Sequence, residues 1–255
     1  MLAVLSCLAI DHNPWLVLLA ASVCVTGCLI ALRIFDRALQ SRGVQRVGWL
    51  FMSAVGAGFT IWSTHFIAML GFSTPAPVSF DPGLTAFSLI VAVAGSFLGL
   101  SIGAGRRLPG QAALGGAFLG LSIAAMHYIG MVAYRVSGII HWDSAYIIGS
   151  IVLAVIPSAA ALHVATLPRV RWSATASIAL LVAGIVGLHF TAMTAVGITP
   201  LDSSLAVNQS EAFEAMALAV AAVGMTILAV GFVSYLIDGQ NRYDARERMR
   251  HLSAH

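Results

Sequence analysis

The sequence predicts an all-α polytopic membrane protein with seven transmembrane helices, and three observations support this prediction. Of its 255 residues, 59% are hydrophobic and only 9% are charged. The apolar residues gather in seven stretches, each near or above the ~20 residues that cross a bilayer. Basic residues are concentrated in alternate connections between these stretches. The stretches cover residues 15–35, 47–72, 84–104, 112–134, 145–166, 174–197 and 212–237.

The chain divides into three parts. Residues 1–11 are apolar but lack the basic start of a secretory leader, so we expect an external N-terminal arm. Residues 12–237 form the seven-helix domain, and residues 238–255 form a charged tail after the last helix. Because helices and short loops use nearly the whole chain, we expect no catalytic activity in it.

The arginines predict the orientation of the domain, since the chain contains no lysine. Twelve of the 13 basic residues lie in the first, third and fifth connections and the tail, and only Arg135 lies on the other side. The positive-inside rule therefore places the N-terminus outside and the C-terminus in the cytoplasm, as an odd number of spans requires.

Three helix starts share a sequence pattern. Asn13-Pro14 and Asp81-Pro82 combine an N-cap residue with proline at the first helical position, and Asp143-Ser144 opens the fifth helix. The interval from Asp81 to Asp143 equals the interval from His65 to His127. This common period predicts three helical-hairpin repeats followed by a seventh helix, with the three caps at the outer face.

A His-aromatic-x-x-Met pattern occurs three times, and the interval between consecutive copies is the same. Histidine and methionine at i and i+4 lie on one helical face, near the outer ends of the second, fourth and sixth helices. Each motif therefore presents an imidazole and a thioether at one level of the membrane, where polar groups are costly and usually functional. The predicted ligands are His65, Met69, His127, Met131, His189 and Met193.

Mixed imidazole and thioether ligands favour copper, whereas zinc sites usually draw on Cys, His and carboxylate. Six candidates exceed the three or four ligands that Cu(I) prefers, so either some are not direct ligands or two ions bind. His12 and His141 are additional candidate ligands, although we expect both to be solvated surface residues.

Met126-His127-Tyr128-Ile129 resembles the motif that names the MHYT domain, a bacterial seven-helix membrane sensor module with three such motifs. The resemblance implies that the motif residues bind a metal, with copper the favoured ion, through which O2, CO or NO is sensed. It also implies a cytoplasmic effector, such as a cyclic-di-GMP enzyme or a histidine kinase. Met126 is the one motif-initial methionine, since Thr64 and Leu188 hold the equivalent positions, and it is the weaker additional ligand.

We therefore expect a multi-pass sensor of the cell inner membrane that responds to a diatomic gas or redox state and signals through its seventh helix. A copper-handling protein or transporter is the first alternative, and a haem-binding membrane protein is the second. A retinal protein is excluded, because no lysine is available for a Schiff base. The expected partners are the lipid bilayer and an effector, not nucleic acid, and a homodimer remains open.

Overall fold

A computed structural model describes residues 2–74, 78–105, 108–167, 172–200 and 209–253. Seven of its helices are long and apolar enough to cross a membrane, which confirms the predicted multi-pass helical architecture. The seventh candidate span, Phe213–Ser234, is part of a longer helix. These helices are α2 (Pro14–Gln40), α3 (Gly43–Leu70), α4 (Pro82–Gly103), α5 (Gln111–Ala133), α6 (Ser144–Thr166), α7 (Ser173–Thr194) and α8 (Gln209–Ser253).

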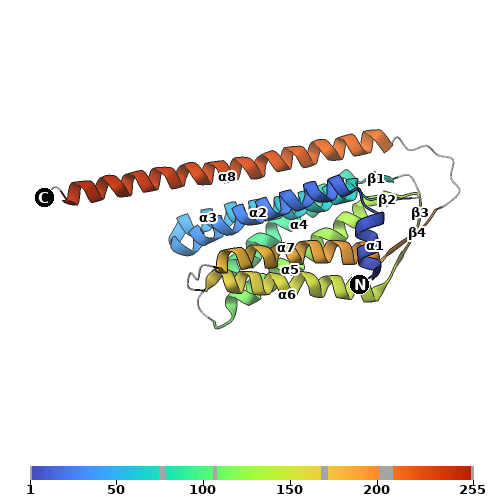
Figure 1. The fold of residues 1–255 in the computed structure, drawn as a ribbon, viewed down its shortest axis with the longest axis horizontal. Helices are drawn as coiled ribbons and strands as arrows, with labels where there is room; N and C mark the ends of the chain where they lie inside the picture. The colour runs from blue at the N-terminus through green and yellow to red at the C-terminus, as the bar shows by residue number, and fades with distance from the viewer. Residues whose placement is uncertain (1, 75–77, 106–107, 168–171, 201–208, 254–255) are drawn as a thin grey trace.

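One end of the helical bundle carries all the described strands and the short helix α1 (Leu2–Ile10), as Figure 1 shows. We call it the strand end. Strand β1 (Val78–Phe80) pairs with β2 (Tyr134–Val136), and β3 (Gly138–Trp142) pairs with β4 (Val196–Pro200), both antiparallel. These strands are not predicted by the sequence. They are only three or five residues long and join connections far apart in the chain, so no local pattern marks them.

The three predicted cap residues begin helices at the strand end. Asn13 accepts a hydrogen bond from the backbone N–H of Trp15 at 3.0 Å, which satisfies one of the free donors at the start of α2. Asp81 accepts one from Leu84 at 3.0 Å, and Asp143 accepts one from Ala145 at 2.8 Å. Each cap therefore sets the residue at which its helix starts.

The same three cap residues join neighbouring helices through their backbones. The N–H of Asn13 donates to the carbonyl of Gly71 at 2.8 Å, that of Asp81 to Ala133 at 2.8 Å, and that of Asp143 to Ala195 at 2.9 Å. The three acceptors are equally spaced along the chain, and each follows a motif histidine at the same short distance in sequence. These equivalent bonds close the α2–α3, α4–α5 and α6–α7 pairs and hold the three histidines at one level.

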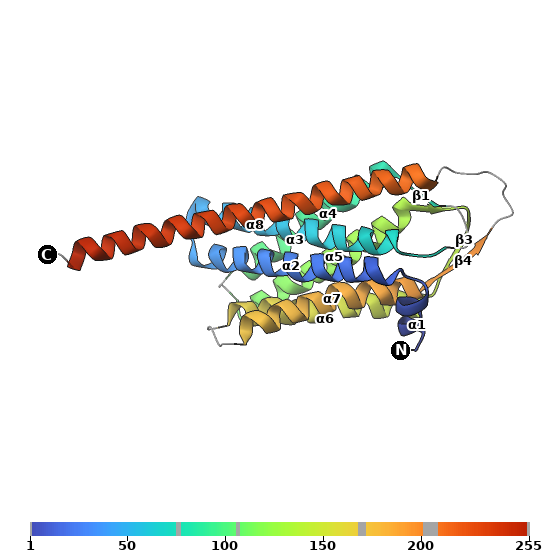
Figure 2. The ribbon, with the colours of Figure 1, turned by 45° about the horizontal axis from the view of Figure 1, so that its top comes forward.

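Helix α8 packs mainly against α3 and runs along the outside of the bundle (Figure 2). Its 45 residues carry it from the strand end past the opposite end of the other helices. The predicted tail that begins at residue 238 continues this helix as far as Ser253.

Candidate metal centre

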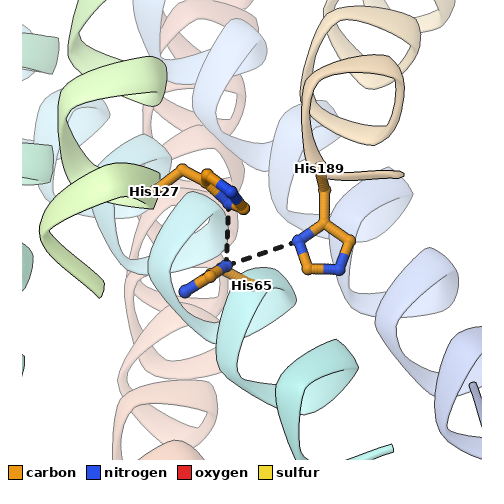
Figure 3. Close-up of side chains that lie close together, drawn as sticks. All are labelled: His65, His127 and His189. Carbon is orange, nitrogen blue, oxygen red and sulfur yellow. Dashed lines mark hydrogen bonds between the residues drawn. The ribbon is translucent and has the colours of Figure 1, made fainter. Parts of the chain in front are cut away.

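The three motif histidines meet inside the bundle near the strand end. His65 comes from α3, His127 from α5 and His189 from α7, and their exposed fractions are 3%, 1% and 5%. The Nδ1 atom of His65 lies 3.1 Å from that of His127 and 3.4 Å from that of His189. Figure 3 shows the three rings facing one another across this small space. One ligand atom from each ring lies within 4.8 Å of the others.

These distances fit nitrogen ligands around a metal ion. With metal–nitrogen bonds of ~2.0–2.1 Å and tetrahedral angles, ligand nitrogens lie about 3.3–3.4 Å apart. An imidazole nitrogen has one in-plane position for a proton or a lone pair. His65 Nδ1 can therefore make only one of its two contacts a good hydrogen bond, whereas an ion between the rings would use all three lone pairs.

The second nitrogen of each imidazole, Nε2, makes no comparable contact. Among the described residues, the buried Nε2 atoms of His65, His127 and His189 have no hydrogen-bond partner. Leaving a buried donor unpaired costs about 1–3 kcal/mol, and a fold rarely carries three such groups without a functional reason. The site is therefore a costly polar cluster within an apolar bundle.

His12 adds a fourth imidazole beside the cluster. Its ring is only 3% exposed and lies 5.7 Å from the ring of His189, centroid to centroid. Its Nδ1 lies 2.9 Å from the carbonyl oxygen of Cys7, and its backbone forms an isolated antiparallel bridge with Phe72. The expectation that His12 is a solvated surface residue is therefore wrong, because this bridge holds the segment before α2 against the end of α3.

His141 has a different position. It lies exposed on β3, where its backbone pairs with Gly197, and it is not part of the imidazole cluster. Its solvated position agrees with the sequence expectation.

The three motif methionines form a separate buried cluster at the strand end. Met69, Met131 and Met193 pack with Cys7, Val78 and Tyr134, and Phe213 at the start of α8 packs against them. Each methionine is four residues, or ~6 Å along its helix, beyond its histidine toward the strand end. The motifs therefore build a layer of imidazoles and, above it, a layer of thioethers.

Two further residues shape the imidazole layer. Met126, only 1% exposed, belongs to the main hydrophobic core and lines an apolar cavity beside the three histidines. Gly130 lies against His65, and a Cβ atom there would be 2.6 Å from His65 Nε2. The His-aromatic-x-x-Met pattern does not specify the residue at this position. It did not reveal that Gly130 makes room for an imidazole.

Three buried titratable side chains near the site, outside the membrane spans, have shifted pKa values. Burial, and then the charge of Asp11, raises the pKa of Cys7 to about 11. Burial likewise raises the pKa of Tyr134 to about 12 and lowers that of His12 below its usual value. At neutral pH these three side chains are therefore uncharged, whereas Asp81 and Arg135 at the same end of the bundle form an ion pair.

This fold and this cluster define an integral membrane domain that gathers three buried imidazoles from alternate helices near one end. Residues 58–116 and 120–178 each match the family model MHYT, described as a bacterial signalling protein N-terminal repeat. The chain therefore belongs to the MHYT family. The interval between the starts of the two matches equals that between His65 and His127, which is 62 residues.

Curated relatives agree with this assignment. An uncharacterized signaling protein of Caulobacter vibrioides is 36% identical over 98% of this chain and 31% of its own length. The bifunctional diguanylate cyclase/cyclic di-GMP phosphodiesterase MucR of Pseudomonas aeruginosa is 35% identical over 92% of this chain and 35% of its own. The cyclic di-GMP phosphodiesterase NbdA of the same organism is 32% identical over 75% and 26%. No solved structure matches.

The chain thus spans about a third or less of the length of these relatives. The part that aligns is the MHYT region, a sensory domain rather than a catalytic one. This confirms the expectation that the seven-helix domain is a sensor module and links it to cyclic-di-GMP signalling proteins.

Proposed function

We propose that this domain is a copper-binding membrane sensor whose metal is held by His65, His127 and His189. The observation that carries the proposal is the meeting of three Nδ1 atoms, 3.1 and 3.4 Å apart, in a buried site. Three neutral imidazoles provide three lone pairs in a site from which the bundle excludes bulk water.

Copper is the metal that best suits the surroundings of the site. Thioethers are soft ligands that favour Cu(I), and three of them lie one turn beyond the histidines. Met69, Met131 and Met193 supply the further ligands, singly or as a second site. Bound copper would provide a redox-active centre and a position for a small ligand, while the protein orients the imidazoles and excludes water. Zinc and haem are the less favoured occupants.

The signal that we propose is a diatomic gas (O2, CO or NO) or a change in redox state. It leaves the site through α8, because Phe213 in its first turns packs against the methionine cluster and the helix continues past the bundle. We propose that the strand end faces the outside of the cell inner membrane, an orientation that the distribution of the arginines favours. The effector is then cytoplasmic, and the names of MucR and NbdA favour a cyclic-di-GMP enzyme.

Metal analysis of the purified domain tests the proposal. Copper-loaded wild type should contain bound copper, and His65→Ala, His127→Ala and His189→Ala should each lose most of it. His141→Ala is the matched control and should retain it, because His141 lies exposed on β3. Equal metal content in all four variants would overturn the site. A Soret band in the optical spectrum would favour haem, and copper flux into vesicles would favour a transporter.

A further inference from the structure

An apolar chamber lies directly beside the three imidazoles. Its volume is about 190 Å³, and side chains from α1, α2, α3, α5 and α7 line it. The deep wall consists of buried residues that include Ile61, Ile123, Ile185 and the three motif histidines. Thr64 and the imidazoles are the polar members of a wall that is otherwise formed by hydrocarbon and Met126.

The size and lining of the chamber suit an apolar guest better than water. A cavity needs only about 10–15 Å³ to hold one water molecule, but an apolar cavity of ~150 Å³ stays dry and accepts benzene or xenon. The chamber is larger than that reference, and its lining is likewise apolar apart from Thr64 and the three imidazoles. It therefore has room for one or more small uncharged molecules next to the imidazole nitrogens.

The rim of the chamber lies at the seam between α2 and α7. Its partly exposed lining residues are Leu8 on α1, Val17 and Ala21 on α2, and Val186 on α7. Ala21 lies two turns into α2, and Val186 lies about two turns before the end of α7. At 1.5 Å per residue both are about 10–12 Å from the strand end of their helices. In a bilayer this level is hydrocarbon, so the part of the rim formed by Ala21 and Val186 faces lipid rather than water, whereas Leu8 lies at the strand end.

We propose that this chamber binds a small, uncharged apolar molecule of the size of a diatomic gas, and that this molecule enters from the bilayer through the α2–α7 seam. Such molecules dissolve in hydrocarbon, whereas ions and water do not enter it readily. The ligand would reach the imidazoles without crossing the strand end. The biological role of this binding rests on the proposed sensing function. The binding itself requires no metal.

Xenon is a suitable probe, because it is apolar and carries no ligating group. Metal-free protein in lipid nanodiscs, labelled at the isoleucine methyl groups, would be placed under xenon pressure and followed by NMR. The Ile61, Ile123 and Ile185 resonances should shift in a saturable way, because these side chains line the chamber. Ile102, near the opposite end of α4, is the internal control and should not shift saturably.

Bulky substitutions at the rim test whether the apolar molecule enters through the α2–α7 seam. Ala21→Trp should abolish or weaken the xenon shifts at least fivefold, and Ala20→Phe provides a second way of filling the chamber if the tryptophan variant fails to fold. Ala86→Trp, on an exposed face of α4, should leave them unchanged.

Three outcomes would overturn the inference: no saturable shift in the wild type, shifts that survive both filling variants, or a lipid or quinone that co-purifies at one per chain and blocks xenon. Because the protein is metal-free, a positive xenon result together with a negative copper analysis would refute the proposed metal site and leave the chamber intact.

Discussion

Gly130 and His65 are in such close contact that a single added carbon atom would disturb the imidazole layer. A Cβ atom at Gly130 would lie 2.6 Å from His65 Nε2, closer than carbon and nitrogen can approach without displacement. The pair joins α5 to α3 at the level of the proposed metal site.

Gly130→Ala should therefore weaken copper binding at least tenfold, because the ring of His65 has to move away from the other two rings. Overpacking of this kind also costs about 1–3 kcal/mol of stability. Competition with a coloured copper chelator measures the affinity. Gly149→Ala on α6 is the matched control, since its new Cβ would meet nothing closer than 3.9 Å. Equal affinities for the two variants would contradict the close contact.

Replacing the motif methionines by leucine separates ligation from packing. Met69→Leu, Met131→Leu and Met193→Leu should each cost less than about 1.5 kcal/mol, because leucine and methionine have similar volumes. If the thioethers bind copper, Cu(I) affinity should fall at least tenfold in one or more of them while thermal stability stays nearly constant. Met52→Leu, on α3 outside the methionine cluster, is the control. Unchanged Cu(I) affinity in all three would limit the site to imidazoles.

The raised pKa of Cys7 predicts slow alkylation. With a pKa of about 11 rather than 9.0, the thiolate fraction at pH 8 is lower by roughly 100-fold. Iodoacetamide labelling of Cys7, followed by mass spectrometry, should be correspondingly slow in the folded protein and fast in denaturant.

The raised pKa of Cys7 also makes the stability of the fold depend on pH. The folded protein favours the protonated Cys7 thiol, because its pKa there lies above the unfolded value. The contribution of Cys7 to the free energy of unfolding is therefore present in full below pH 9 and is lost as the pH rises from 9 toward 11. Asp11→Asn should lower the Cys7 pKa and speed labelling, because the Asp11 charge is the second cause of the shift. Rapid labelling of the folded wild type at pH 8 would refute the buried placement.

Removing the cap of α2 tests how the strand end is held. Asn13→Ala loses the hydrogen bond from Trp15 N–H and should destabilise the domain by ~1 kcal/mol, whereas Asn13→Asp retains an acceptor and should cost less. Both variants keep the backbone bond to Gly71, so the position of His65 and the metal affinity should hardly change. Thermal unfolding in nanodiscs gives the first quantity, and the chelator assay gives the second.

The sequence predicted the helices well, because each span is a long apolar run and its cap is a local signal. It also predicted that three histidines would share one level, since a fixed period places equivalent residues at equivalent depths. It could not predict that the Nδ1 atoms of His65 and His127 approach to 3.1 Å, which depends on how α3 and α5 pack. The burial of His12 was missed for a related reason. It results from a bridge to Phe72, a partner that lies far away in the chain, beyond α2 and α3.

Helix α8 has a mechanical consequence that follows from its length. Its 45 residues span ~68 Å at 1.5 Å per residue, and Phe213 rests on the methionine cluster near one end. If the helix behaves as a stiff lever, a tilt of one degree at that end displaces the other by about 1 Å. A sub-ångström movement of the methionine sulfur atoms can thus produce a larger displacement at the far end of α8. The other six spans need not move for the signal to be transmitted.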